Sequence, residues 1–552
     1  MPHRPDPAPP ALVELRLLDG PNLYFARAAC KVVLDVSGLL LLPEEELRDR
    51  AAAWGTSLGR GGTAGSEVRA RAVSRVLAAV TRRLAATAGV ARLAVRSRPG
   101  PEPAQLTIAF PWRRRELARA LGVALAEAVD GTVGDLSQAP HGTGPTTPRP
   151  RIPVVAVTGT NGKTTTTRLI AHMSRCAGNV TGWTSTDGVY VDGVAVEEGD
   201  WSGYGGAGRV LGDRRVQLAV LETARGGLLL RGAGTRHNDV SVVTNVGADH
   251  LGLQGIHTVD DLAEVKAVVP RLTREGGWCV VNAQDPRVLA MRSASKGRPW
   301  AFSLDPDAPG VRAVLAEGGR ATSVLDEQVV LLDGEGGVDP LVPLADVPMT
   351  LAGLSRHDVA NALAAASAGL AVGLPRHAVV QGLRTFTAEQ NPGRMNLWDV
   401  RGCVVVLDLA HNEDSLQALL AVVRGLRVPG GRVVTVLGTG GDRLDEQLRE
   451  LGHLARHGSD EVVLALKSRY LRGRSPEDML AQLRAGAGDA PAHDDEVTAL
   501  RSVLLDRRPE DAVAFLCHQD RPACEQVLRE AGGHPMSVEE VRARVLRGRG
   551  RP

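Results

Sequence analysis

The chain has 552 residues, of which 43% are hydrophobic and 23% charged, with a formal net charge of +2. This length exceeds one ordinary hydrophobic core, so we expect three or four domains. The near-neutral charge argues against nucleic acid as a partner, because chains that bind nucleic acid usually carry a strong basic excess.

The ends and the cysteines of the chain exclude further classes. None of the six cysteines forms a CxxC pair, which argues against a disulfide scaffold or a zinc ribbon. The N-terminus lacks an apolar signal core, and no apolar run reaches about 18 residues. We therefore expect a cytoplasmic protein that does not cross a membrane.

The first part of the chain, residues 1–137, predicts a small α+β domain. Short apolar runs such as LVELRLL and AQLTIAF alternate there with long helical patterns rich in Ala, Arg and Leu. Residues 138–150 are rich in Pro, Gly and Thr and predict a linker.

The remainder predicts two α/β domains, at 151–392 and 393–552. In the first, the apolar runs PVVAVTG, QLAVLE, VSVVTNV and GWCVVNA alternate with helical stretches, which is typical of a parallel sheet covered on both faces. Residues 305–350 have the composition of strands and turns. After a boundary at NPGR (391–394), the runs CVVVLDLA, RVVTVLG, EVVLAL and DAVAFL predict a second, smaller sheet.

A phosphate-binding loop is predicted at residues 159–165, Gly159-Thr160-Asn161-Gly162-Lys163-Thr164-Thr165. It follows an apolar strand and opens a helix, so that backbone N–H groups can face phosphate oxygens. Lys163 would neutralise the β- and γ-phosphates, and the Thr164 hydroxyl would bind Mg²⁺. Val157 stands where the usual P-loop has its first glycine, so the motif alone leaves a motor, a kinase, a switch or a ligase open.

Three further residues could act beside this loop. Glu222 ends an apolar strand of the same sheet, where a carboxylate can be a second Mg²⁺ ligand, or simply a solvated strand end. His250 follows Asp249 at the end of another strand. Lys266 is one of only five lysines against 60 arginines, which favours a role that needs an amine over a lysine that merely extends to solvent.

The stretch GYGGAG (203–208) fits a dinucleotide-binding pattern but follows EEGDWS rather than an apolar strand. We therefore expect a mobile glycine loop near the acceptor site rather than a dinucleotide site.

The motifs VTGTNGKTT, LETARGG, TNVGADHLG, RHDVANALAA, NPGRMN, DLAHN and LGTGGDR, in this order, resemble the Mur ligase superfamily over residues 151 to about 550. TSTDGVYVDG, LETARGG, NPGRMNLWDV and YLRGR are most similar to the Mur-like half of cyanophycin synthetase. The N-terminal LLDGPNLYFAR also resembles that enzyme's N-terminal domain. Cyanophycin synthetase has an ATP-grasp domain between these parts, whereas here the linker joins them directly, so the resemblance implies one ligation rather than two.

The resemblance implies ATP and two Mg²⁺ ions as cofactors. Lys163 would hold the phosphates, Thr164 and Glu222 the first Mg²⁺, and His250 the second. Lys266 matches the lysine that many Mur ligases carry as a carbamate. Lys163, His250, Lys266 and Arg394 are thus the expected catalytic residues.

The resemblance also assigns residues to the nucleotide and the amine. Asn361 matches a position near the adenine, Arg394 would reach the phosphates at the hinge between domains, and Asp408 matches a ribose-contacting aspartate. Lys467, Arg469, Arg472 and Arg474 either meet a carboxylate or phosphate of the amine substrate or form a solvated basic loop.

The expected function is an ADP-forming ligase that activates an acceptor carboxylate as an acyl phosphate and couples it to the amine of an amino acid. Two alternatives stay open: a cyanophycin-type or polyglutamate-type polymer ligase, and an inactive nucleotide-binding scaffold that partners an ATP-grasp enzyme. SGYGGAGRV (202–210) replaces the usual cyanophycin-type acceptor motif, so both substrates are left open, as is a homo-oligomer.

Overall fold

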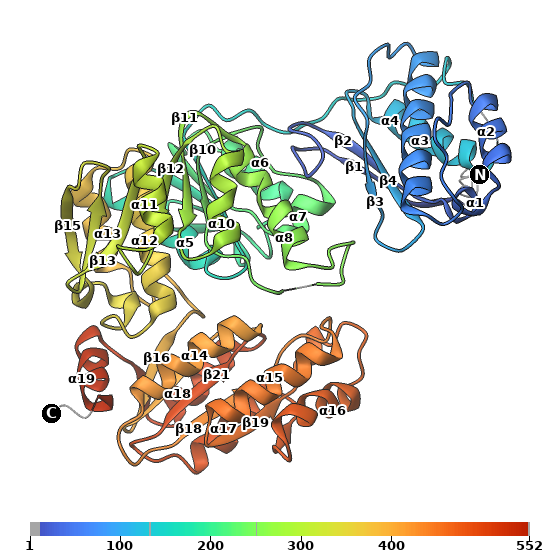
Figure 1. Cartoon of the computed structure of the whole chain (residues 1–552). Helices are drawn as coiled ribbons and strands as arrows, with labels where there is room; N and C mark the ends of the chain where they lie inside the picture. Colours follow the sequence, from blue (N-terminus) through green and yellow to red (C-terminus); the bar gives the residue numbers. More distant parts are fainter. Residues whose placement is uncertain (1–10, 132–133, 250, 550–552) are drawn as a thin grey trace.

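The computed structural model describes residues 11–131, 134–249 and 251–549. Figure 1 shows three units, each built on its own sheet: the N-terminal unit in blue, the central unit from cyan to yellow, and the C-terminal unit in orange and red. The central unit contacts both of the others.

The N-terminal unit is a four-stranded antiparallel sheet covered by helices. Its strands are β1 (Leu12–Leu18), β2 (Ala29–Asp35), β3 (Arg96–Pro99) and β4 (Gln105–Pro111), in the order β1-β2-β4-β3. Alternate residues of β2, such as Val32 and Leu34, pack against α3 (Glu67–Thr87) and α4 (Arg115–Val129). The short helices α1 (Ser37–Leu41) and α2 (Glu44–Ala53) complete this face. The α+β composition is therefore as expected.

The central unit has an eleven-stranded sheet in the order β15-β14-β13-β12-β11-β10-β5-β9-β6-β7-β8. The strands from β13 to β6 in this order run parallel, and an antiparallel hairpin extends each edge. The strands are β5 (Val154–Thr158), β6 (Thr181–Ser185), β7 (Gly188–Val191), β8 (Val194–Glu198), β9 (Leu218–Glu222), β10 (Asn238–Val243), β11 (Thr273–Asn282), β12 (Arg298–Phe302), β13 (Arg320–Leu325), β14 (Gln328–Leu332) and β15 (Val338–Pro343).

Helices cover both faces of the central sheet. Val155 and Val157 of β5 pack toward α5 (Lys163–Cys176), α12 (Arg356–Ala371) and α13 (Arg376–Thr385), whereas Ala156 packs toward the other face. The helices of that face are α6 (Tyr204–Gly212), α7 (Arg225–Leu230), α8 (Val259–Lys266), α9 (Val268–Arg271), α10 (Pro286–Ala290) and α11 (Pro309–Ala316). Burial on both faces explains why these strands are continuously apolar.

The C-terminal unit has a seven-stranded sheet in the order β20-β19-β18-β21-β17-β16-β22. Its strands are β16 (Asn396–Val400), β17 (Cys403–Asp408), β18 (Val433–Leu437), β19 (Glu461–Ala465), β20 (Ala492–His493), β21 (Ala512–Leu516) and β22 (Gly533–Pro535). One face packs on α14 (Glu413–Leu426), α15 (Asp445–Gly458), α16 (Pro476–Ala487) and α19 (Val538–Gly548), and the other on α17 (Glu496–Leu505) and α18 (Arg521–Glu530).

Two local expectations are wrong. Residues 203–208 are not a glycine loop, since Tyr204–Gly212 forms α6, whose residues Ala207 and Val210 are buried against the sheet. Residues 305–350 also contain the helix α11, which begins at Pro309 and buries Val311 and Val314. In both cases burial of one apolar helical face outweighs a composition rich in Gly and Pro.

Arg544 of α19 ties the end of the chain to the C-terminal sheet. Its side chain is 1% exposed and donates hydrogen bonds to backbone carbonyls of three separate segments, at Leu426, at Gly402 and at residues 509–511. Five donors in one rigid guanidinium make this multiple capture possible.

We expect Arg544→Met to lower the free energy of opening of the C-terminal sheet by about 3 kcal/mol, because several buried carbonyls lose their donor. Hydrogen exchange of β17 peptides measures this change. Arg547→Met, on the exposed face of the same helix, is the control and should leave the exchange unchanged. Equal exchange in both variants would contradict the expectation.

Candidate active site

The phosphate loop lies between β5 and α5 and requires glycine at two positions. Gly162, which caps α5, has a φ of 81°, and a Cβ there would lie 2.1 Å from Oδ1 of Asn361. A Cβ on Gly159 would lie 1.8 Å from the hydroxyl of Thr244. That hydroxyl donates to the carbonyl of Asn161 at 2.6 Å and so holds the loop from behind. The loop can therefore present backbone N–H groups at the start of a long helix.

Glu222 lies directly beside this loop because β9 pairs in parallel with β5, with Glu222 opposite Val157. Its side chain is buried, and its Oε2 accepts a hydrogen bond from the Thr164 hydroxyl at 2.9 Å. Its Oε1 is buried with no hydrogen-bond partner among the described residues. Burial raises the pKa of Glu222, although Lys163 and the Thr164 hydroxyl oppose the shift.

Two lysines flank the loop. Lys163 donates to the carbonyl of Thr160 at 2.7 Å, and Lys266, at the end of α8, donates to the carbonyl of Gly159 at 2.6 Å. Lys266 is only 3% exposed. Burial, and then the positive charge of Lys163, hold the pKa of Lys266 well below its ordinary value. Lys266 can therefore exist as a neutral amine.

The C-terminal unit supplies a second carboxylate and an arginine. Asp408 ends β17, is buried, and accepts a hydrogen bond from the Met395 N–H at 2.9 Å. Burial raises its pKa, while the charge of Arg394 acts in the opposite direction. Arg394 also opposes the rise in the pKa of Glu222 that burial causes, so its charge acts on both carboxylates.

Contacts between the central and C-terminal units involve the phosphate loop itself. The side-chain amides of Asn161 and Asn412 exchange two hydrogen bonds, at 2.9 and 3.1 Å. Arg443 of the C-terminal unit forms an ion pair with Asp249, at 3.3 Å. Arg168 of α5 donates to the side chain of Asn391 at 3.1 Å, immediately before the C-terminal unit begins. The position of the C-terminal unit is therefore linked to the loop conformation.

These elements enclose a cavity of about 730 Å³ between the central and C-terminal units. Most of the predicted site residues line it: Gly159, Thr160, Asn161, Gly162, Lys163, Thr164, Thr165, Glu222, Lys266, Arg394 and Asp408. His357 of α12 also lines the cavity, whereas Asn361 of the same helix lies against Gly162, and its predicted place near the adenine stays a prediction. His250 lies outside the described residues, and its role as a metal ligand stays an expectation.

Other lining residues were not predicted from the sequence. Arg225 and Arg231 line the cavity together with Glu222. Arg225 belongs to the LETARGG motif, so its position after a strand end could have identified it. Arg231 lies outside the motifs noted in the sequence, so no sequence pattern identified it as a lining residue.

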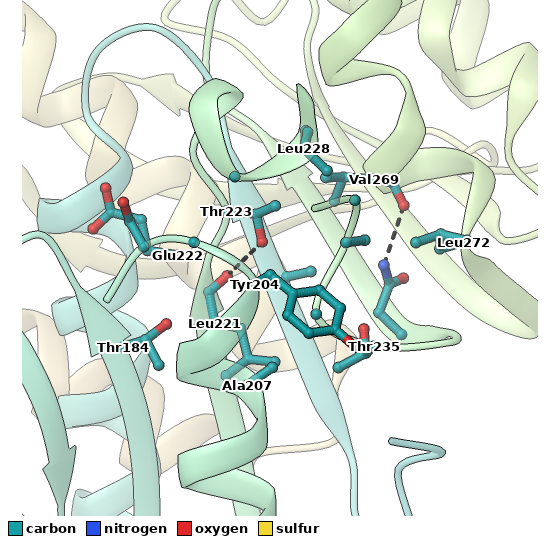
Figure 2. A pocket seen from close by; sticks show the side chains of 18 residues that line it. Thr184, Tyr204, Ala207, Leu221, Glu222, Thr223, Leu228, Thr235, Val269 and Leu272 are labelled. Atoms are coloured by element: carbon teal, nitrogen blue, oxygen red, sulfur yellow. Dashed lines mark hydrogen bonds between the residues drawn. The ribbon is translucent and has the colours of Figure 1, made fainter. Parts of the chain in front are cut away.

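A second, much smaller cavity of about 20 Å³ lies beside β9 (Figure 2). Tyr204, Thr223 and Leu228 are on its wall, and Asn238 donates to the carbonyl of Val269 at 3.1 Å while its own side-chain oxygen is buried without a partner among the described residues. The volume suits one water molecule rather than a substrate.

The basic stretch at residues 467–474 is not uniformly available to a substrate. Lys467 is buried, pairs with Glu496 and donates to the carbonyl of Leu516 at 2.5 Å, so it is neither a ligand-binding nor a solvated residue. Burial by itself would raise the pKa of Glu496, but Lys467 and the N–H groups before α18 lower it overall. Arg474 pairs with Asp445 and Asp478, whereas Arg472 lines the large cavity.

Comparison with known proteins identifies the family. The model of the Mur ligase middle domain matches residues 157–369, and that of the Mur ligase glutamate ligase domain matches residues 393–517. The UDP-N-acetylmuramoyl-L-alanyl-D-glutamate--2,6-diaminopimelate ligase of Parasynechococcus marenigrum is 30% identical over 449 residues, which cover 74% of this chain and 82% of that relative. The chain belongs to the Mur ligase family.

Within the Mur ligase family, the similarity to cyanophycin synthetase is higher but partial. The enzyme of Synechocystis sp. is 42% identical over 327 residues, which cover 59% of this chain and only 37% of that relative. The structure of a pseudomurein peptide ligase type C from Methanothermus fervidus has a TM-score of 0.50 at 16% identity, over 69% of this chain and 79% of that one, and supports the fold alone.

The comparisons confirm the α/β fold and the resemblance to the Mur-like half of cyanophycin synthetase, and they indicate a ligase. Both family models begin after the N-terminal sheet. Within the described part of the chain, no helix combines the length and the apolar character that crossing a bilayer requires.

We expect Gly162→Ala to weaken the affinity for ATP by at least about tenfold, equivalent to about 1.4 kcal/mol. The added Cβ would force the loop away from Asn361 and from its left-handed conformation. Isothermal titration calorimetry measures the effect.

Gly178→Ala is the matched control, because Gly178 follows the same helix and has the same φ of 81°. No described atom lies within 4 Å of an added Cβ at this position. An equal loss of affinity in both variants would show that strain at the ends of α5, and not the loop, accounts for the result.

Proposed function

We propose that this Mur ligase family member is an ADP-forming amide ligase. It activates the carboxylate of a small molecule or peptide as an acyl phosphate and couples it to the amine of an amino acid. The carboxylate oxygen attacks the γ-phosphorus of ATP and ADP leaves; the amine then attacks the acyl carbon, phosphate leaves, and the amine proton passes to solvent. The observation that carries this proposal is the cavity to which two units contribute charged groups around one phosphate loop.

Two features of the chain fit the nucleotide and its metal. Gly159 and Gly162 let the loop pack directly on Thr244 and Asn361, where any side chain would collide, and this packing holds the backbone N–H groups of the loop at the start of α5, where they can face phosphate. The unpaired, buried Oε1 of Glu222 and the Thr164 hydroxyl beside its Oε2 are hard oxygen donors, the kind that Mg²⁺ prefers. Mg²⁺ would neutralise phosphate charge when bound there.

The protein's own groups would act mainly by positioning and charge. Lys163 and Arg394 bring positive charge to the phosphates from the two units. Asp408 would accept hydrogen bonds from the ribose. His250 would hold a second Mg²⁺.

A cyanophycin-type ligase that extends an amino-acid polymer is the second candidate, because the identity to cyanophycin synthetase is 42%. The polyglutamate-type alternative involves the same chemistry with another acceptor. The inactive scaffold is less well supported, because Lys163, Thr164, Glu222, Lys266 and Arg394 are all present around one cavity.

We expect phosphate release to require ATP, Mg²⁺, an acceptor carboxylate and an amine together, as measured with pools of candidate acceptors and amino acids. With a carboxylate labelled by ¹⁸O, one labelled oxygen should appear in the released phosphate, because the acyl phosphate retains the bridging oxygen. Release without substrates, or unlabelled phosphate, would contradict the proposal.

Lys163→Met should abolish this activity, because the phosphates would lose the positive charge that the loop itself supplies. Lys296→Met removes an exposed lysine and should leave the activity unchanged. A scaffold without catalytic activity would show no turnover in the unchanged protein, in Lys163→Met or in Lys296→Met.

We expect Lys266 to be carbamylated, since its buried amine can be neutral and can add CO₂ with loss of one proton. Incubation with ¹³C-bicarbonate should give a carbamate resonance in the carbon NMR spectrum that grows as the pH rises, because the reaction consumes neutral amine and releases a proton. The resonance should be missing in Lys266→Arg. Its persistence in that variant would place the carbamate elsewhere.

A further inference from the structure

The N-terminal unit docks against the wall of the large cavity through the loop that follows β1. The N–H of Gly20 donates to the carbonyl of Arg231 at 3.0 Å, and the N–H of Ala233 donates to the carbonyl of Pro21 at 2.6 Å. A Cβ on Gly20 would lie 1.9 Å from the carbonyl oxygen of Ala233. This close backbone contact therefore depends on a glycine.

Asp19 forms the polar centre of this contact. Its side chain is 1% exposed, and its Oδ2 accepts from Arg231 through Nε at 2.7 Å and through Nη2 at 2.6 Å. Its Oδ1 pairs with Arg115 of α4. Two guanidinium groups thus share one carboxylate, which leaves one positive charge in excess.

Tyr204 extends the contact to the first turn of α6. The Arg231 guanidinium lies over its ring at 4.8 Å, a cation–π contact. The Tyr204 hydroxyl is 2.9 Å from the hydroxyl of Thr147, which in turn donates to the backbone carbonyl of Asp19 at 2.6 Å. In Figure 2, Tyr204 is seen on the wall of the small cavity beside β9, and it also lines the large one.

Arg231 is consequently held by residues of the N-terminal and central units at the edge of the large cavity. It lines that cavity immediately after α7, and its side chain is 53% exposed. Nε and Nη2 are engaged by Asp19, whereas Nη1 has no hydrogen-bond partner among the described residues. A fixed guanidinium with a spare donor and excess charge suits an anion.

We propose that Asp19 is a positioning residue for the ligase site and that Arg231, which it orients, binds an anionic group of the acceptor substrate. The identity of the acceptor rests on the function proposed above. Asp19 lies outside both matched family regions, so the N-terminal unit would contribute to the active site of this protein.

The kinetic test uses Asp19→Asn, Arg231→Met and the double variant, with the carboxylate that gives the most phosphate release in the pooled assay as the probe. Each single change should raise KM for that carboxylate about tenfold and leave kcat and KM for ATP unchanged. Asp19→Asn should add nothing when Arg231 is already Met, because it acts through that residue.

Glu264→Gln is the matched control, because Glu264 pairs with Arg98 across the same two units but does not line the large cavity. It should leave all kinetic constants unchanged. The proposal would be overturned if Glu264→Gln raised KM for the carboxylate as much as Asp19→Asn does, or if the effects of Asp19→Asn and Arg231→Met were additive in the double variant. A loss of kcat with every KM unchanged in the two single variants would also overturn it.

Hydrogen exchange provides a test that needs no turnover. Asp19→Asn should speed exchange in peptides from residues 200–212 and 225–236, and Glu264→Gln should not. Equal exchange in the two variants would overturn the positioning role. If no carboxylate supports turnover while the exchange result is as expected, the ligase function fails and the positioning of Arg231 by Asp19 stands.

Discussion

Glu222 and Lys266 are buried on either side of the phosphate loop, and each gives up hydration that its surroundings only partly replace. Among the described residues, Oε1 of Glu222 has no hydrogen-bond partner, and Lys266 donates only to the backbone carbonyl of Gly159. A buried ionisable group without full compensation destabilises a fold, and such groups are concentrated at functional sites. The glycines of the loop, the parallel pairing of β5 with β9 and the capped start of α8 all serve to hold these two groups in place.

The same site also links the separate units. Asn161 belongs to the phosphate loop and exchanges hydrogen bonds with Asn412 of the C-terminal unit, while Arg394 acts on carboxylates of both units. On the other side, Asp19 of the N-terminal unit holds Arg231 at the cavity wall. A ligase of three reactants benefits from this arrangement, because each unit can contribute to the orientation of a different reactant.

Much of the central site could be predicted from local sequence. Strand followed by glycine loop followed by helix is a short-range pattern, and Glu222 and Asp408 both end apolar strands, so their place at the carboxyl edge of a sheet follows from strand direction alone. The expectations at 203–208 and at Lys467 were wrong for a common reason. Composition suggested exposure, whereas packing against a sheet buried Ala207, and Glu496, 29 residues away in the chain, neutralised Lys467.

The sequence by itself determined the α/β fold, the phosphate loop and the family, because these depend on periodicity and on motifs within short stretches of chain. Only the tertiary structure decided that Asn361 packs against Gly162 of the loop, that Lys467 is in an internal ion pair, and that Asp19 reaches Arg231 across 212 positions of sequence. The physical reason is that burial and ion pairing depend on which surfaces meet. No local pattern records the contact between two units that fold on separate sheets.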